Sequence, residues 1–167
     1  MRPCSRFQLR QRIPVRTVGL RDHRYHFLPL GSVLYFFAGG AAGGNVAIPG
    51  YAPTVFQRGR VYARTRSSVY ATCFHTISTL IENLDLSCFG RAHRSILVNL
   101  RQVEMFDPGR GTPRIGFRLT QEPFEWIPVA GSCVRQIRKS LGLPVSILRV
   151  PADHALLPLQ WAGVGPH

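Results

Sequence analysis

Short runs in which apolar and polar residues alternate, separated by glycine and proline, restrict the folds open to this sequence. In Arg114–Thr120, the apolar residues Ile115, Phe117 and Leu119 occupy every second position. Because successive side chains of a β-strand point to opposite faces, this pattern predicts a strand with one buried face. Further strands are predicted over Tyr25–Leu28, Val33–Phe37, Arg58–Arg66, Val69–Cys73, Ser95–Leu100, Val103–Phe106 and Phe124–Val129.

Two segments have the spacing of a short amphipathic helix. The first is predicted over 76–84, where apolar residues recur three and four positions apart. The second is predicted over 132–141, with Ser132 as its N-cap and Gly142 closing its C-terminus. The fold class expected from these patterns is mainly β and antiparallel, with two short helices.

The chain is strongly basic. It has 167 residues, with 21 Lys and Arg against 8 Asp and Glu, and a formal net charge of +13. Lys139 is the only lysine. Because such a charge repels itself in a compact fold, it indicates a polyanionic partner. Arginine binds phosphate and guanine edges through two hydrogen bonds more readily than lysine does.

One predicted strand concentrates this charge. Across positions 58–66, every second residue is arginine or tyrosine, so a regular strand would carry these side chains on one face. Like charges on one face repel, which favours an anionic partner there. The alternative is a solvated face on which the charges are only spread out. We expect phosphate contacts from Arg58, Arg60, Arg64 and Arg66.

Cysteine usage and hydropathy indicate the compartment. The four cysteines, Cys4, Cys73, Cys88 and Cys133, are widely scattered, so no disulfide framework is expected. No run approaches the roughly 20 apolar residues of a membrane-spanning helix. We therefore expect a cytoplasmic protein that does not enter a membrane.

Metal binding and catalysis find little support in the residue pattern. Cys73, His75, Cys88 and His93 could bind zinc by type, but their spacing fits none of the paired-ligand patterns. Ser95 beside His93 could suggest a nucleophile and a base, but no carboxylate lies nearby in sequence to orient the imidazole. We expect no enzyme activity, no metal and no cofactor.

Composition divides the chain into three parts. Residues 1–14 are expected to form a basic arm, since the first 21 residues hold six arginines and no acid. Residues 15–143 are expected to form the folded domain, with a Gly/Ala/Pro-rich insertion over about 39–57 that we interpret as an exposed loop. Residues 144–167 contain four prolines and are expected to form a tail.

The segment after the first predicted helix carries a specific motif. Residues 88–100 combine a basic turn with a strongly apolar strand. They resemble the signature of the LytTR family of bacterial DNA-binding domains, which reads Phe-x-Arg-x-His-Arg-Ser, an apolar pair, then Val-Asn. The matching residues are Phe89, Arg91, His93, Arg94, Ser95, Val98 and Asn99. The flanking elements follow the family order too, so the resemblance covers roughly residues 15–143.

The resemblance implies an elongated, mainly antiparallel β domain that places loops into successive grooves of double-stranded DNA, as the output part of a transcription regulator. His93 and Arg94 would then read base edges, while Arg91 and Ser95 would contact phosphate. Asn99 lies inside an apolar strand and is expected to satisfy backbone groups instead.

The resemblance also implies an assembly. Paired half-sites are usual in the family, so we expect a homodimer on repeated half-sites. Most members carry a receiver domain, for which the fewer than about 25 residues before the first predicted strand leave no room. We therefore expect a stand-alone output domain whose control comes from a separate regulatory protein, from the arm or tail, or from abundance.

Two departures from the family pattern concern base contacts. A base-contacting loop of the family corresponds here to residues 39–57, none of which can be matched to it. The Ser-Arg pair that usually precedes the last helix is replaced by Ala130 and Gly131. We expect that contact to be absent or to have moved to Arg135 or Arg138.

Two other functions remain open. The missing arginine at Gly131 favours a family member that binds a protein instead of DNA, and the basic composition suits an RNA-binding module equally well. Recognition of single-stranded RNA needs exposed aromatic rings on which bases stack. Phe106, Phe117 and Phe124 are instead expected to face inward.

Overall fold

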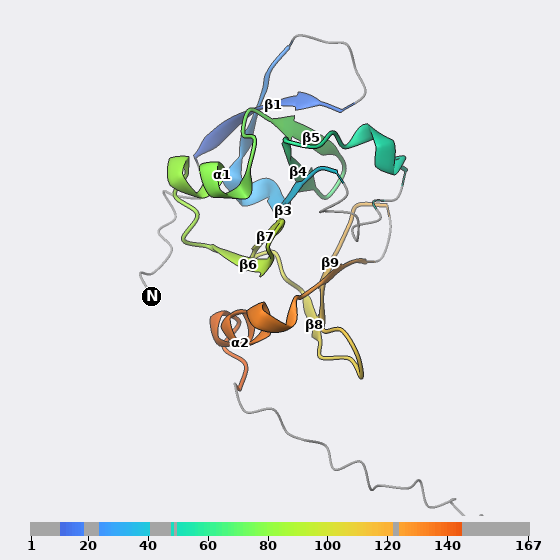
Figure 1. The fold of residues 1–167 in the computed structure, drawn as a ribbon, viewed down its shortest axis with the longest axis vertical. Helices are drawn as coiled ribbons and strands as arrows, with labels where there is room; N and C mark the ends of the chain where they lie inside the picture. The colour runs from blue at the N-terminus through green and yellow to red at the C-terminus, as the bar shows by residue number, and fades with distance from the viewer. Residues whose placement is uncertain (1–10, 19–23, 41–47, 49, 122–123, 145–167) are drawn as a thin grey trace, which may run out of the picture.

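The computed structural model of the chain describes residues 11–18, 24–40, 48, 50–121 and 124–144 (Figure 1). Within these residues the strands form one seven-stranded and one three-stranded sheet, both antiparallel, accompanied by two α-helices. The chain is therefore mainly β, as predicted. The expected tail beyond residue 144, most of the arm and residues 41–47 of the insertion lie outside the described residues.

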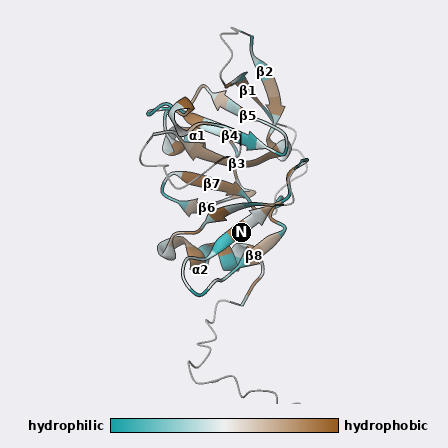
Figure 2. Cartoon of the chain, turned by 90° about the vertical axis from the view of Figure 1, so that its right-hand side faces the viewer, coloured by the Kyte–Doolittle hydropathy of each residue, from teal (hydrophilic) through white to brown (hydrophobic). Residues whose placement is uncertain are grey.

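The larger sheet has the strand order β2-β1-β5-β4-β3-β7-β6, and the smaller sheet has the order β10-β9-β8. The strands of the larger sheet are β1 (Arg12–Thr17), β2 (His26–Pro29), β3 (Val33–Ala38), β4 (Val61–Thr65), β5 (Val69–Thr72), β6 (Phe89–His93) and β7 (Ile96–Asn99). The smaller sheet consists of β8 (Met105–Asp107), β9 (Arg114–Phe117) and β10 (Glu125–Pro128). The helices are α1 (Ile77–Asn83) and α2 (Gly131–Ser140). Figure 2 shows the strands of the larger sheet stacked along the long axis of the domain, with α2 and β8 at one end.

Every predicted strand is present with shifted ends, but β1 and β6 were not predicted. β1 begins at Arg12, so the last residues assigned to the basic arm belong to the sheet. Its buried side chains, Ile13 and Val15, do alternate with exposed or half-buried ones. The density of arginine around them concealed this short alternation.

Hydrophobic residues pack on both faces of the larger sheet, which explains why the central strand β3 reads as an unbroken apolar run. Phe37 and Tyr62 lie in a cluster with Phe117 of the smaller sheet and Ile137 of α2. Phe36, which precedes Phe37 in β3, lies in the other cluster together with residues of β1, β4 and α1. Each large side chain buried in this way contributes roughly 1.5–3 kcal/mol.

The two helices differ at their N-termini. Thr76 caps α1 through a reciprocal capping box with Thr79, within the helix predicted over 76–84. The N-cap of α2 is Ala130, which has no side chain that can cap, so the predicted capping by Ser132 is wrong. The predicted role of Gly142 is confirmed, because it adopts φ 72° and donates its amide to Lys139 O at 3.1 Å.

The described part of the Gly/Ala/Pro-rich insertion is only in part the exposed loop that was predicted. Its exposed residues are Gly50, Ala52, Thr54 and Gln57. Ile48 and Phe56 are buried in the core. Gly39 is also buried, and a Cβ atom there would lie 2.3 Å from the carbonyl oxygen of Gln57. Glycine is thus required at this position because the backbone of the insertion folds tightly back onto β3.

The described residues were also compared with the predictions about disulfides, membrane spans and metal sites. Cys73 and Cys133 are free thiols, whereas Cys88 is disulfide-bonded, which the scattered cysteines did not predict. No helix in this part of the chain is long and apolar enough to cross a membrane. The side chains of these residues form no group of three His, Cys, Asp or Glu that could hold a metal ion.

Candidate nucleic-acid interface

The family-like motif forms a tight hairpin between β6 and β7. His93 pairs with Ile96, so Arg94 and Ser95 are the two residues of the turn. The Arg94 side chain is exposed at its tip. Ser95 is buried, and its carbonyl oxygen accepts a hydrogen bond from the amide of Ala38 at 2.9 Å. The turn is thereby attached to the end of β3.

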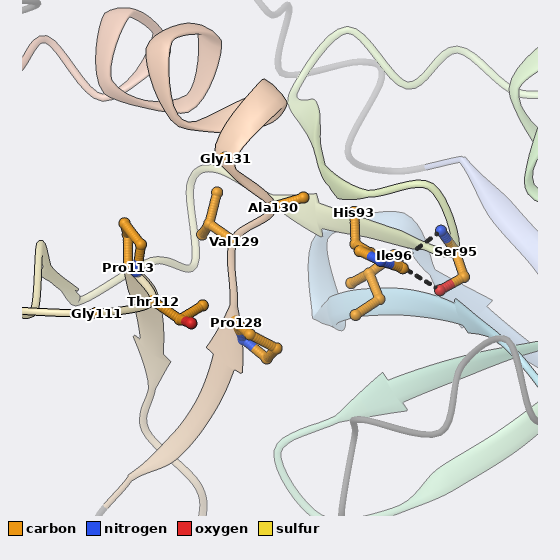
Figure 3. Close-up of a pocket in the computed structure, with 10 residues that line it drawn as sticks. All are labelled: His93, Ser95, Ile96, Gly111, Thr112, Pro113, Pro128, Val129, Ala130 and Gly131. Atoms are coloured by element: carbon orange, nitrogen blue, oxygen red, sulfur yellow. Dashed lines mark hydrogen bonds between the residues drawn. The ribbon is translucent and has the colours of Figure 1, made fainter.

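The imidazole of His93 is fixed against the same turn. Its Nδ1 lies 2.8 Å from the hydroxyl oxygen of Ser95, and the backbone amide of Ser95 donates to this nitrogen at 3.3 Å (Figure 3). The Ser95 hydroxyl, for which a phosphate contact is predicted, lies next to the imidazole in the structure.

A second basic segment lies beside this turn. The amide of Gly39, next along the chain from Ala38, donates to the carbonyl oxygen of Arg60 at 2.9 Å. The end of β3 is therefore flanked by Arg60 on one side and by the Arg94–Ser95 turn on the other. Arg58 is exposed and Arg60 is half-buried. These arginines, far apart in sequence, come together at one end of the larger sheet.

Arg64 does not belong to this surface, contrary to the prediction of one exposed arginine face. Its side chain is 6% exposed, and its guanidinium contacts Glu125 of β10 at 2.8 and 2.9 Å. The hydroxyl of Tyr35 donates to the other oxygen of the same carboxylate. Burial, followed by the neighbouring negative charge of Glu125, raises the pKa of Tyr35 well above its usual value. Arg64 thus stabilises the junction of the two sheets.

Arg66 is exposed but lies at the opposite end of β4 from Arg58 and Arg60. It contacts Gln102 at 3.1 Å and Glu104 at 3.6 Å. The regular alternation predicted over 58–66 is present only within β4. As a result, the four arginines do not form one face.

Of the remaining arginines predicted to bind DNA, some are exposed and one contacts other groups of the protein. Arg91 on the edge strand β6 and Arg135 on α2 are exposed. Arg138 is half-buried, donates through Nε to the carbonyl oxygen of Pro144 at 2.9 Å and lies 5.9 Å from the ring of Phe106. Asn99 is buried and bonds to the backbone of Val33 and Arg101, which confirms its expected structural role.

A further basic site near Arg60 was missed by the sequence reasoning. Arg16 of β1 lies over the ring of Tyr25 at 4.5 Å and donates to its hydroxyl. Together with Arg60 and Cys73, these two residues line a small hollow. The sequence did contain a signal for this site. Arg12 and Arg16 lie at alternate positions to the apolar Ile13 and Val15, which places both arginines on the polar face of a strand.

Aromatic residues also lie on the outer face of the smaller sheet. Phe124 was predicted to face inward, but it is half-buried, stacks on Trp126 and lies 5.4 Å from the guanidinium of Arg118. Arg118 is in turn paired with Glu104 at 2.9 Å. Because acids pair with the arginines here, this surface is less favourable for a polyanion than the Arg94 turn.

A cleft of about 380 Å³ separates the Arg94 turn from the N-terminus of α2. His93, Ser95 and Ile96 line one side, and the opposite walls come from the β8–β9 loop and from the junction of β10 with α2 (Figure 3). Ala130 and Gly131, the positions of the missing Ser-Arg pair, belong to this wall. Their small side chains leave the cleft open beside His93.

Comparison with known proteins supplies a family for this arrangement. The family model of the LytTr DNA-binding domain matches residues 55–142, which include the Arg94 turn and α2. A LytTr DNA-binding domain from Bacillus cereus superposes with a TM-score of 0.53 at 19% sequence identity, covering 78% of this chain and 98% of that one. At this identity the structural likeness establishes the fold. No curated protein sequence matches the chain.

Proposed function

The chain belongs to the LytTR family of DNA-binding domains, and on that premise we propose that it is a sequence-specific regulator of transcription. Its ligand in this proposal is double-stranded DNA, gripped at the end of the larger sheet where the Arg94 turn meets Arg58 and Arg60. Two copies would occupy repeated half-sites, as the expected homodimer requires.

The observation that carries this proposal is the exposed guanidinium of Arg94 on a fixed turn. The turn has only two residues, and Ser95 is bonded to the end of β3. Within the described part of the chain, no acid is paired with Arg94 or with Arg58. Because the backbone of the turn is held in place, only the side chain of Arg94 has to be ordered when its guanidinium donates two hydrogen bonds to guanine O6 and N7.

The other exposed arginines suit contacts to phosphate. Arg58, Arg60, Arg91 and Arg135 are exposed or half-buried, and in a chain of net charge +13 each would release counterions from any duplex it touches. Arg64, Arg66 and Arg138 are left out of the proposed interface because each already contacts other groups of the protein.

The proposal can be tested in two steps. DNA duplexes that bind the protein are selected from a random pool, and their affinities are then measured at stated salt concentrations. Arg94→Ala should weaken binding of the selected site by ~1–3 kcal/mol and relax its sequence preference at one position. Arg58→Ala should weaken the binding of all sequences alike. It should also reduce the slope of log affinity against log salt concentration by the amount expected for about one phosphate contact.

Arg66→Ala is the matched control, since it removes an exposed arginine from the other end of β4. It should leave affinity and preference close to those of the wild type. The proposal fails if Arg94→Ala behaves like Arg66→Ala. A pool in which no sequence is enriched would instead favour the family member that binds a protein.

A further inference from the structure

The hydrogen bonds of the Arg94 turn determine which nitrogen of His93 carries a proton. The backbone amide of Ser95 points at Nδ1 of His93 at 3.3 Å. A backbone N–H can only donate, so Nδ1 must accept and must have a free lone pair. A neutral imidazole holds its single proton on the other nitrogen. We infer that His93 is fixed as the Nε2–H tautomer and presents a hydrogen-bond donor to the DNA.

The turn that imposes this tautomer is itself held in place. Ser95 is 5% exposed, and its carbonyl oxygen is bonded to the amide of Ala38 at 2.9 Å. The hydroxyl oxygen of Ser95 lies 2.8 Å from Nδ1, and a hydroxyl can donate to that nitrogen when the nitrogen carries no proton. A proton on Nδ1 would direct two N–H groups at each other across 3.3 Å, so the alternative tautomer loses the bond to the amide.

The other edge of the ring adjoins the cleft described above. His93 is among its lining residues, and in Figure 3 the imidazole lies between Ser95 and the segment that leads into α2. A group that enters from the DNA therefore meets an N–H and must bring an acceptor. Purine N7, guanine O6, thymine O4 and phosphate oxygens are acceptors, whereas the amino groups of adenine and cytosine are not.

This inference rests on the proposed function for its ligand, but the tautomer can be measured without DNA. Long-range ¹H–¹⁵N NMR of the neutral imidazoles distinguishes a protonated ring nitrogen from a bare one. His93 should show a protonated Nε2 and a bare Nδ1. Averaged shifts, or a proton on Nδ1, overturn the inference.

His75 supplies an internal reference in the same spectrum. Its Nδ1 lies 3.0 Å from the carbonyl oxygen of Gly59, and a carbonyl can only accept, so His75 should carry its proton on Nδ1. The two histidines are therefore expected to show opposite patterns. A Ser95→Ala variant retains the backbone amide and should leave the His93 pattern unchanged.

Base analogues locate the acceptor on the selected duplex. A 7-deazapurine removes N7 from one base, and a methylphosphonate removes the charged oxygen of one phosphate. At the contacted position, one of these should reduce wild-type affinity by about tenfold. In His93→Asn, the side-chain oxygen can still accept from Ser95, but no donor remains at the place of Nε2. The same analogue should then cause little further loss.

The outcomes separate the two proposals. Equal losses in wild type and His93→Asn at every analogue position would show that His93 donates to no DNA acceptor, and would overturn its role in recognition. If no duplex binds at all, the proposed function fails, while the NMR result still decides the tautomer.

Discussion

Replacement of Glu125 by glutamine removes the one carboxylate that neutralises Arg64 inside the protein. The side chains of Arg64 and Glu125 are 6% and 3% exposed, and the carboxylate accepts from both Arg64 and Tyr35. Removing one partner of such a pair leaves a buried charge and typically costs about 3–5 kcal/mol. Because a domain of this size is stable by only about 5–15 kcal/mol, the loss should be a large fraction of the total.

Urea denaturation followed by circular dichroism measures this loss. With a slope of about 2 kcal/mol/M, a loss of 4 kcal/mol lowers the midpoint by about 2 M. Asp107→Asn is the matched control, because it breaks the pair between the exposed side chains of Arg114 (51% exposed) and Asp107 (36% exposed), and solvent screens such a pair strongly. If Glu125→Gln is no more destabilising than this control, then Arg64 does not depend on Glu125 and the reasoning is refuted. The triple replacement Arg64→Met, Glu125→Leu and Tyr35→Phe should recover most of the loss, since neither a charge nor an unpaired hydroxyl is then buried.

Three further predictions concern stability. The raised pKa of Tyr35, caused first by burial, means that the unfolded chain loses this proton above about pH 10 while the folded chain keeps it. Stability should therefore fall by up to about 1.4 kcal/mol per pH unit above pH 10, and Tyr35→Phe should lack this component in alkaline urea titrations. Thr76→Ala removes the capping box of α1 and should cost about 1 kcal/mol in urea denaturation, whereas Thr112→Ala on an exposed loop should cost far less. Gly142→Ala forces a Cβ into φ 72° and should cost about 1 kcal/mol or more, with Gly111→Ala, whose Cβ would meet open space, as its comparison in thermal unfolding.

The strands could be predicted where local alternation sufficed, as in β9, where Ile115 and Phe117 are fully buried. Alternation assigns residues to a face, but it does not say what covers that face. Arg64 shows the limit, because its partner Glu125 is 61 residues away in sequence and belongs to the other sheet. Ile48 and Phe56 were missed for a related reason, since isolated apolar residues among glycines have no periodicity to reveal their burial.

The candidate site was predictable in part. The His93–Arg94–Ser95 motif was visible as a string of residues, and Arg94 is exposed on the hairpin as the resemblance implied. The approach of Arg60 to that hairpin depends on the pairing of β4 and β7 with β3, which no local pattern encodes. The contact between His93 and Ser95 could not be predicted either, because it depends on the tightness of a two-residue turn.

The hairpin strand β6 is the last strand of its sheet, and an open edge of this kind can recruit a strand from another molecule. Here the residue that precedes α2 lies against that edge, because the amide of Ala130 is bonded to the carbonyl oxygen of Ala92. This bond occupies a backbone acceptor on the edge of the hairpin and so opposes intermolecular strand pairing there. Copies brought close together would therefore be hindered from aggregating through their hairpins.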